Sequence, residues 1–215
     1  MYEYIDSYCE RVAPGLLGEP LNAITNLAFM IAALWLWRIA RRYHRDRSWM
    51  LRTLVILLFA TGVCSLIFHS FANVIGVILD SLALTLCLLA AILFSARVWL
   101  HQGWWTAALW PVGMIVAAFV LGGVVPVEGA AYLGPFVTGA LMAGILILRG
   151  HPAGRDVAIG IACFVPSFFF RSIDAPVCEA FPSGTHFLWH MLNACVLGFA
   201  ILPFARLDPR RLPPR

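Results

Sequence analysis

The chain has 215 residues, of which 61% are hydrophobic and only 12% are charged. Soluble domains carry about 25% charged residues, and a water-soluble fold of this size could not bury so much apolar surface. The composition therefore predicts an integral membrane protein. The net charge of +4 comes from arginines spread over the polar connecting segments, so nucleic acid is not an expected partner.

The apolar segments predict the fold class. A helix that crosses a bilayer needs about 20 mostly apolar residues, and seven segments approach or meet this length, which predicts an all-α bundle of seven transmembrane helices. We expect one membrane domain over residues 1–205 and a cytoplasmic, proline-rich tail over 206–215. The expected spans are Leu21–Ala40, Met50–Phe71, Val74–Arg97, Trp104–Gly122, Ala131–Leu148, Val157–Phe170 and Thr185–Phe204.

The arginines predict the orientation of this bundle. Thirteen of the fifteen basic residues fall on one side of the predicted spans, and only Arg11 and Arg171 fall on the other. Cytoplasmic segments retain arginine and lysine. We therefore expect the N-terminus outside and the C-terminus in the cytoplasm, in a bacterial inner membrane.

Four ionisable side chains lie inside the predicted spans near the outer end of the bundle. His69 lies near the end of the second span, Asp80 in the first turns of the third, and His186 and His190 at the start of the seventh. Ionisable groups within a bilayer are costly and usually mark function. Because His186 and His190 are four residues apart, they share one face of their helix.

This arrangement predicts a catalytic zinc site of His69, His186 and His190, since such sites have three protein ligands and one open position. Zinc lowers the pKa of a bound water to about 7. We expect Asp80 to orient that water and carry its proton to the leaving amine. Ser65, one turn before His69, is expected to stabilise the oxyanion. Helix packing is the alternative explanation for each histidine, and haem also suits a histidine pair with this spacing.

The chain resembles the alkaline ceramidases in three stretches. Their Ser, His and Asp signature is similar to Ser65-Leu-Ile-Phe-His69 followed by Asp80, and their late histidine pair is similar to His186-Phe-Leu-Trp-His190. Their opening segment is similar to Tyr8-Cys9-Glu10 with Glu19-Pro-Leu-Asn22. The resemblance implies the same zinc site and hydrolysis of the amide bond of ceramide-like lipids to a fatty acid and a sphingoid base.

The resemblance also implies two features of the polar segment before Leu21, here called the leader. One is a disulfide between Cys9 and Cys178. The other is a calcium ion held by Asp6, Glu10 and Glu19; the alternative is an acidic leader that only follows the topology. This chain departs from the ceramidases here, because Val12 stands where they have an asparagine and the interval to Glu19 is shorter.

Other functions remain open at this point. The progestin and adiponectin receptors are similar in the same residues, which makes a receptor with a structural zinc the main alternative. A transporter or a haem-binding electron carrier is the third. Asn22 and Asn26 either support the metal site or form hydrogen bonds between helices. A lipid substrate is the expected partner, and no obligate protein partner is predicted.

The predicted orientation can be tested with a reporter fused after Arg215. A reporter that is active only in the cytoplasm should give a signal, because the arginine-rich segments are expected on that side. A paired reporter that is active only outside should stay silent, and the opposite pair of signals would reverse the topology.

Overall fold

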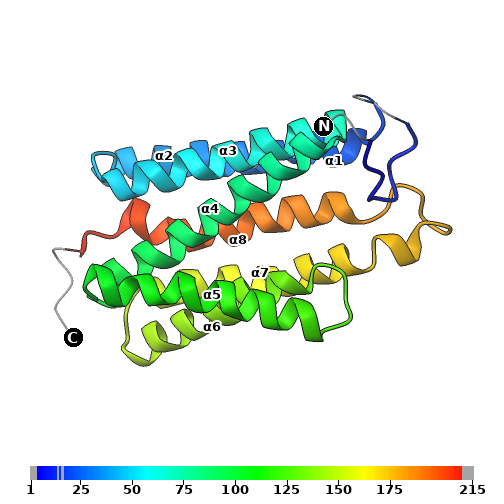
Figure 1. Cartoon of the computed structure of the whole chain (residues 1–215). Helices are drawn as coiled ribbons and strands as arrows, with labels where there is room; N and C mark the ends of the chain where they lie inside the picture. Colours follow the sequence, from blue (N-terminus) through cyan, green and yellow to red (C-terminus); the bar gives the residue numbers. More distant parts are fainter. Residues whose placement is uncertain (1–3, 14, 16, 210–215) are drawn as a thin grey trace.

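The computed structural model describes residues 4–13, 15 and 17–209, which are helical apart from loops and one isolated bridge between Tyr4 and Asn73. Figure 1 shows the helices running roughly along one common direction. In chain order the elements are α1 Pro20–Thr25, α2 Leu27–Arg42, α3 Trp49–Phe71, α4 Val74–Trp99, α5 Trp104–Val124, η1 Ala130–Tyr132, α6 Leu133–Leu148, α7 Ala153–Ser172, η2 Ala175–Val177 and α8 His186–Arg206.

The prediction of seven spans is confirmed. Within the described residues, seven helical segments are long and apolar enough to cross a membrane, with α1 and α2 forming the first and η1 and α6 the fifth. The chain is therefore a multi-pass membrane protein of the all-α class. Helix α8 ends at Arg206, and residues 210–215 of the expected tail lie outside the described part.

The predicted sixth span was too short. Helix α7 begins at Ala153, four residues before the predicted start, and it continues through Pro166. The polar residues of its first turn made this start look like a loop in the sequence. In the structure Asp156 is buried and accepts hydrogen bonds from Arg206 on α8, from Nε at 2.9 Å and from Nη2 at 2.6 Å. A charged residue that is paired in this way can lie inside a helical bundle.

Helix α8 occupies the centre of the bundle. It packs against α2 on one side and α7 on the other (Figure 1), and it is the most enclosed of the seven spans, whereas α5 is the least. The core around it is apolar and includes Leu36, Leu54, Leu197 and Ile201. The first turn of α8 therefore lies deep inside the molecule, although it directly follows a loop.

A tight turn brings the end of α3 beside the start of α4. Ala72 has a left-handed backbone with φ 44°, and its N–H donates to the Phe68 carbonyl. Asn73 then caps α4 by accepting a hydrogen bond from the Gly76 N–H at 2.8 Å. The leader binds the same turn, because the Ile5 N–H donates to the Ala72 carbonyl at 2.9 Å. This turn places His69 and Asp80 at the same end of the bundle.

Candidate metal centre

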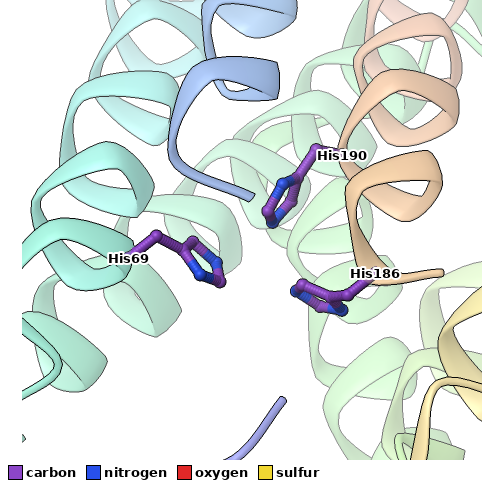
Figure 2. A group of neighbouring side chains, drawn as sticks. All are labelled: His69, His186 and His190. Carbon is purple, nitrogen blue, oxygen red and sulfur yellow. The ribbon is translucent and has the colours of Figure 1, made fainter. Parts of the chain in front are cut away.

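Three histidines meet between α3 and α8. His69, His186 and His190 are all buried, and one ring nitrogen from each lies within 4.8 Å of the others. Figure 2 shows the three rings facing one shared space. In the described part of the chain, no other group of three or more His, Cys, Asp or Glu residues has this geometry. The predicted convergence is confirmed, and the group could hold a metal ion.

Glu19 holds the His69 ring through its Nδ1 atom. Its Nδ1 lies 2.5 Å from Glu19 Oε2, while its Nε2 is buried without a hydrogen-bond partner among the described residues. Glu19 also accepts hydrogen bonds from Asn22 Nδ2 at 2.9 Å and from Arg11. A carboxylate behind a metal-binding histidine fixes its tautomer and leaves the other nitrogen free for the metal.

The charge state of Glu19 supports this role. Burial raises the pKa of Glu19, but the hydrogen bonds from His69 and Asn22, together with the nearby charge of Arg11, outweigh it and hold the pKa below its ordinary value. Glu19 is therefore an ionised acceptor, and we infer that His69 Nδ1 carries the proton. The free Nε2 is then a lone-pair donor, as a metal ligand must be.

His190 is oriented by a similar but neutral partner. Its Nδ1 lies 3.1 Å from the Thr25 hydroxyl, which donates to the Leu21 carbonyl at 2.7 Å. The hydroxyl can therefore accept a hydrogen bond from the Nδ1–H group, which leaves Nε2 available. His186 is fixed differently: its ring stacks on Tyr8 with 3.8 Å between centroids, and its Nδ1 is buried without a hydrogen-bond partner among the described residues. These unpartnered buried nitrogens fit a metal ion.

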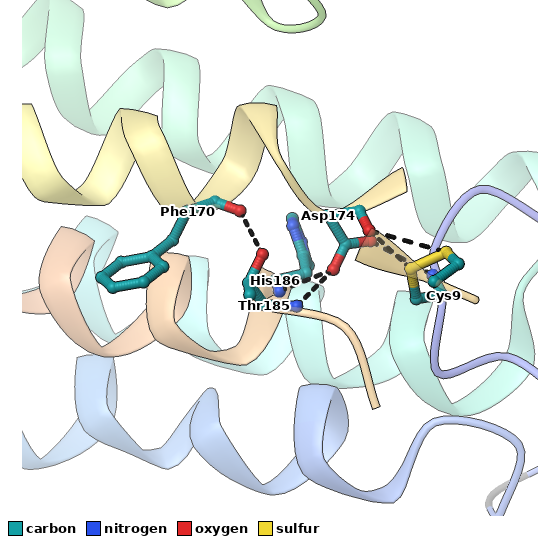
Figure 3. Close-up of a disulfide and its surroundings, with 6 residues drawn as sticks. Cys9, Phe170, Asp174, Thr185 and His186 are labelled. Carbon is teal, nitrogen blue, oxygen red and sulfur yellow. Dashed lines mark hydrogen bonds between the residues drawn. A yellow bond between two sulfur atoms is a disulfide. The ribbon is translucent and has the colours of Figure 1, made fainter. Parts of the chain in front are cut away.

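Asp174 sets the position of His186, and the sequence analysis missed it. Its Oδ1 accepts hydrogen bonds from the N–H groups of Thr185 at 2.6 Å and His186 at 2.9 Å, and its Oδ2 accepts from the Cys9 N–H at 3.1 Å (Figure 3). The carboxylate thus caps the first turn of α8 and holds the leader against it. The twelve-residue separation from His186 resembles no local capping motif, so the sequence carried no recognisable signal.

The predicted disulfide between Cys9 and Cys178 is present, with Cα atoms 5.2 Å apart. This separation lies within the usual range for disulfides. Figure 3 shows the bond beside Asp174. The disulfide therefore ties the leader to the loop before α8, next to the histidine group.

The structure does not bring the three leader carboxylates together as a metal site. Asp6 is exposed, while Glu10 is buried and accepts hydrogen bonds from the N–H groups of Leu21 at 2.6 Å and Asn22 at 2.7 Å. Glu10 thus caps α1, and Glu19 supports His69. Calcium binding stays a prediction from resemblance, because the geometry gives two of its expected ligands other partners.

Ser65 and Asp80 face the same small polar cavity as the histidine pair. The cavity has a volume of about 20 Å³, which is enough for a water molecule. Ser65 is buried and interacts with the half-buried Asp80 carboxylate. Tyr8 and Arg171 complete much of the wall. Burial raises the pKa of Tyr8 to about 12, although Arg171 opposes this shift, so its phenol stays protonated at neutral pH.

An apolar cavity of about 70 Å³ adjoins the polar one. It lies between α4, α6, α7 and α8, and three residues line both spaces: Leu84, Tyr132 and Asn193. Met142 and Phe164 also line it. The site thus combines a histidine group that could hold a metal ion, a carboxylate and an adjoining apolar space.

Replacing Glu19 with glutamine should weaken metal binding by about 10- to 100-fold, the range for partners that orient metal ligands. Glutamine keeps the shape but loses the charge that holds His69 Nδ1 as a donor. Competition with a coloured zinc chelator would measure the affinity. The exposed Glu179→Gln provides the matched control, and equal affinities of both variants would contradict the role of Glu19.

No protein-family model matches this chain, and no curated protein matches it either. The observations describe a seven-span membrane protein with a buried group of three histidines that could hold a metal ion.

Proposed function

We propose that the chain is a zinc-dependent amide hydrolase that cleaves N-acyl lipids inside the membrane, releasing a fatty acid and an amine. One observation carries this proposal: three buried histidines converge on one point, and two of them, His186 and His190, line a cavity that also presents Asp80 and Ser65. The resemblance to the alkaline ceramidases favours ceramide-like lipids as the substrate class.

The donor set favours a catalytic rather than a structural zinc ion. Neutral imidazoles suit zinc, and structural zinc sites usually have four protein ligands. The group in the described residues has three. When bound, the metal would polarise the acyl carbonyl and lower the pKa of a coordinated water.

The residues of the chain supply the proton transfers. Hydrolysis adds the oxygen of water to the acyl carbon and breaks the bond between that carbon and nitrogen. Asp80 lies on the wall of the cavity and can accept the proton that water loses and give it to the departing nitrogen. The Ser65 hydroxyl can donate to the acyl oxygen as negative charge develops there. The water, the acyl oxygen and the departing nitrogen thus each have a partner residue in this scheme.

The adjoining apolar cavity supports a lipid substrate. An acyl chain placed there would continue directly from the polar cavity, because Leu84, Tyr132 and Asn193 belong to both walls. The scissile amide would then lie beside the histidines, with the amine part toward the leader. The alternative is a protein like the progestin and adiponectin receptors, which would bind a lipid beside the metal without cleaving it.

Incubation of the purified protein with mixed N-acyl lipids should release free fatty acid, measured by mass spectrometry. A zinc chelator should abolish the release, and added zinc should restore it. His69→Ala should lose both bound metal and activity, whereas the exposed loop variant His101→Ala should keep both. Retained metal without any release of fatty acid would contradict hydrolysis and favour the receptor alternative.

Asp80→Asn should lower kcat by about 100- to 10,000-fold, the usual contribution of general acid–base catalysis. Metal content should stay at the wild-type level, because Asp80 is not part of the histidine group. Single-turnover kinetics and elemental analysis of the same preparation would check both statements. A parallel loss of metal and activity would assign Asp80 to metal binding instead.

A further inference from the structure

Arg171 is a charged residue in a membrane-spanning helix that the proposed reaction does not use. It lies in the last turn of α7 and lines the polar cavity together with Asp80, His186 and His190. Charged side chains within membrane spans are rare, and they usually pair with one another or mark a substrate pathway. The surroundings of Arg171 show which of these explanations applies.

Two other arginines that contact the bundle have close acidic partners. Arg11 pairs with Glu19, and Arg206 donates to Asp156 at 2.6 and 2.9 Å. Arg171 differs from both. Its acidic contact is Glu128, whose side chain is 55% exposed, at a long 3.4 Å. No other acidic residue forms an ion pair with Arg171 in the described part of the chain.

Aromatic rings surround the guanidinium instead. Its central carbon lies 5.3 Å from the ring centroid of Tyr132, 5.4 Å from Trp189 and 5.9 Å from Tyr8. Such contacts stabilise a cation without neutralising it. Apolar walls also strengthen any electrostatic interaction made between them. The Asp80 carboxylate on the same cavity wall interacts electrostatically with Arg171 but forms no ion pair with it, so the guanidinium keeps hydrogen-bonding groups that a bound anion could use.

The guanidinium is held in place with hydrogen-bonding capacity left over. Nη1 lies 3.4 Å from the Tyr8 hydroxyl and Nη2 3.4 Å from Glu128, both long contacts, and Nε has no hydrogen-bond partner among the described residues. Gly129, with φ +77°, packs so closely that a Cβ there would come within 2.6 Å of Nε. The loop before η1 thus fixes the side chain, while the Nη groups remain weakly bonded.

We propose that Arg171 binds an oxyanion on the amine side of the substrate, so that the chain prefers N-acyl lipids with a carboxylate or phosphate near the amide over neutral ones. The planar guanidinium fits either group with paired hydrogen bonds. This inference rests on the proposed amide hydrolysis and names the substrate class within it.

The direction of the substrate follows from the two cavities. The apolar cavity includes Val157 and Phe164 of α7, and Arg171 lies seven residues beyond Phe164, which is about 10 Å further along the helix. An acyl chain in the apolar cavity therefore points away from Arg171. The amine part of the same molecule, on the other side of the histidines, points toward it.

Two matched pairs of lipids test this preference and distinguish the two oxyanions. N-palmitoylglycine carries a carboxylate where N-palmitoylethanolamine carries a hydroxyl, and ceramide 1-phosphate carries a phosphate that ceramide lacks. With the zinc-loaded wild-type protein, kcat/KM should be about 10- to 100-fold higher for the anionic member of at least one pair, the effect of a charge-assisted hydrogen bond. Ratios near one in both pairs would overturn the proposal.

Variants separate binding from packing. Arg171→Gln should bring the ratio of the preferred pair to within about threefold of one, mainly through KM, and Arg171→Lys should retain part of the preference. Arg155→Gln, which removes an exposed arginine from the other end of α7, should leave the ratio unchanged. An equal fall for both members of a pair in Arg171→Gln would show that Arg171 only supports the fold.

A milder variant applies if Arg171→Gln does not fold. Glu128→Gln removes the acidic group that competes for Nη2, and it should lower KM for the anionic lipid about two- to threefold. An unchanged or raised KM would overturn the proposal. If no lipid is hydrolysed, the proposed function fails by itself. Equilibrium binding of radiolabelled N-palmitoylglycine, tighter to the wild type than to Arg171→Gln, would then support Arg171 separately, and equal binding would overturn it.

Discussion

The ionised carboxylate of Glu19 connects three parts of the chain on which the histidine group depends. It accepts hydrogen bonds from Arg11 in the leader, Asn22 in α1 and His69 in α3. Arg11 also donates to the His69 carbonyl at 2.8 Å. Burying a carboxylate is costly unless charges and hydrogen bonds compensate it. Here that compensation is possible only when the leader, α1 and α3 are all in place, so the geometry of His69 depends on all three.

The leader also fixes the opposite side of the site. Cys9 reaches Asp174 through its N–H and the loop before α8 through the disulfide to Cys178. Asp174 in turn caps α8 at His186. One segment before the first span therefore positions histidines on two helices that are more than a hundred residues apart in the sequence. Support of this kind holds metal ligands in place before the metal binds, which reduces the cost of binding.

The sequence predicted the parts of this site that depend on the helical spacing of residues and on how deep each residue lies along its membrane span. Hydropathy located the seven spans, and the one-turn spacing of His186 and His190 placed both rings on one face. Adding His69 required only that the ends of neighbouring spans lie at one depth. The disulfide came from resemblance to a family, and it is present.

The supporting residues could not be predicted because their partners are distant in the chain. Asp174 acts on Cys9 across 165 residues, and Glu19 acts on His69 across 50. Resemblance assigned Glu10 and Glu19 to calcium, yet a carboxylate bonds equally well to a cation or to N–H groups. Only the packing of the leader decides between these partners. The start of α7 was missed for the same reason, since Arg206 neutralises Asp156 from another helix.

Two polar contacts, here called clamps, connect α7 and α8 and constrain how a lipid could enter the adjoining apolar cavity. At one end Asp174, just after α7, accepts a hydrogen bond from the His186 N–H, and at the other end Asp156 of α7 pairs with Arg206 of α8. The cavity between these clamps has a volume of about 70 Å³, smaller than the 300–1,000 Å³ typical of ligand pockets. Because both helix ends are fixed, separating the helices would break a partly buried ion pair or a helix cap. An acyl chain would more easily make room by rotating the flexible side chain of Met142 and the ring of Phe164, which line the cavity. The end of the bundle that carries the histidines could then stay rigid while the apolar cavity changes shape around a ligand.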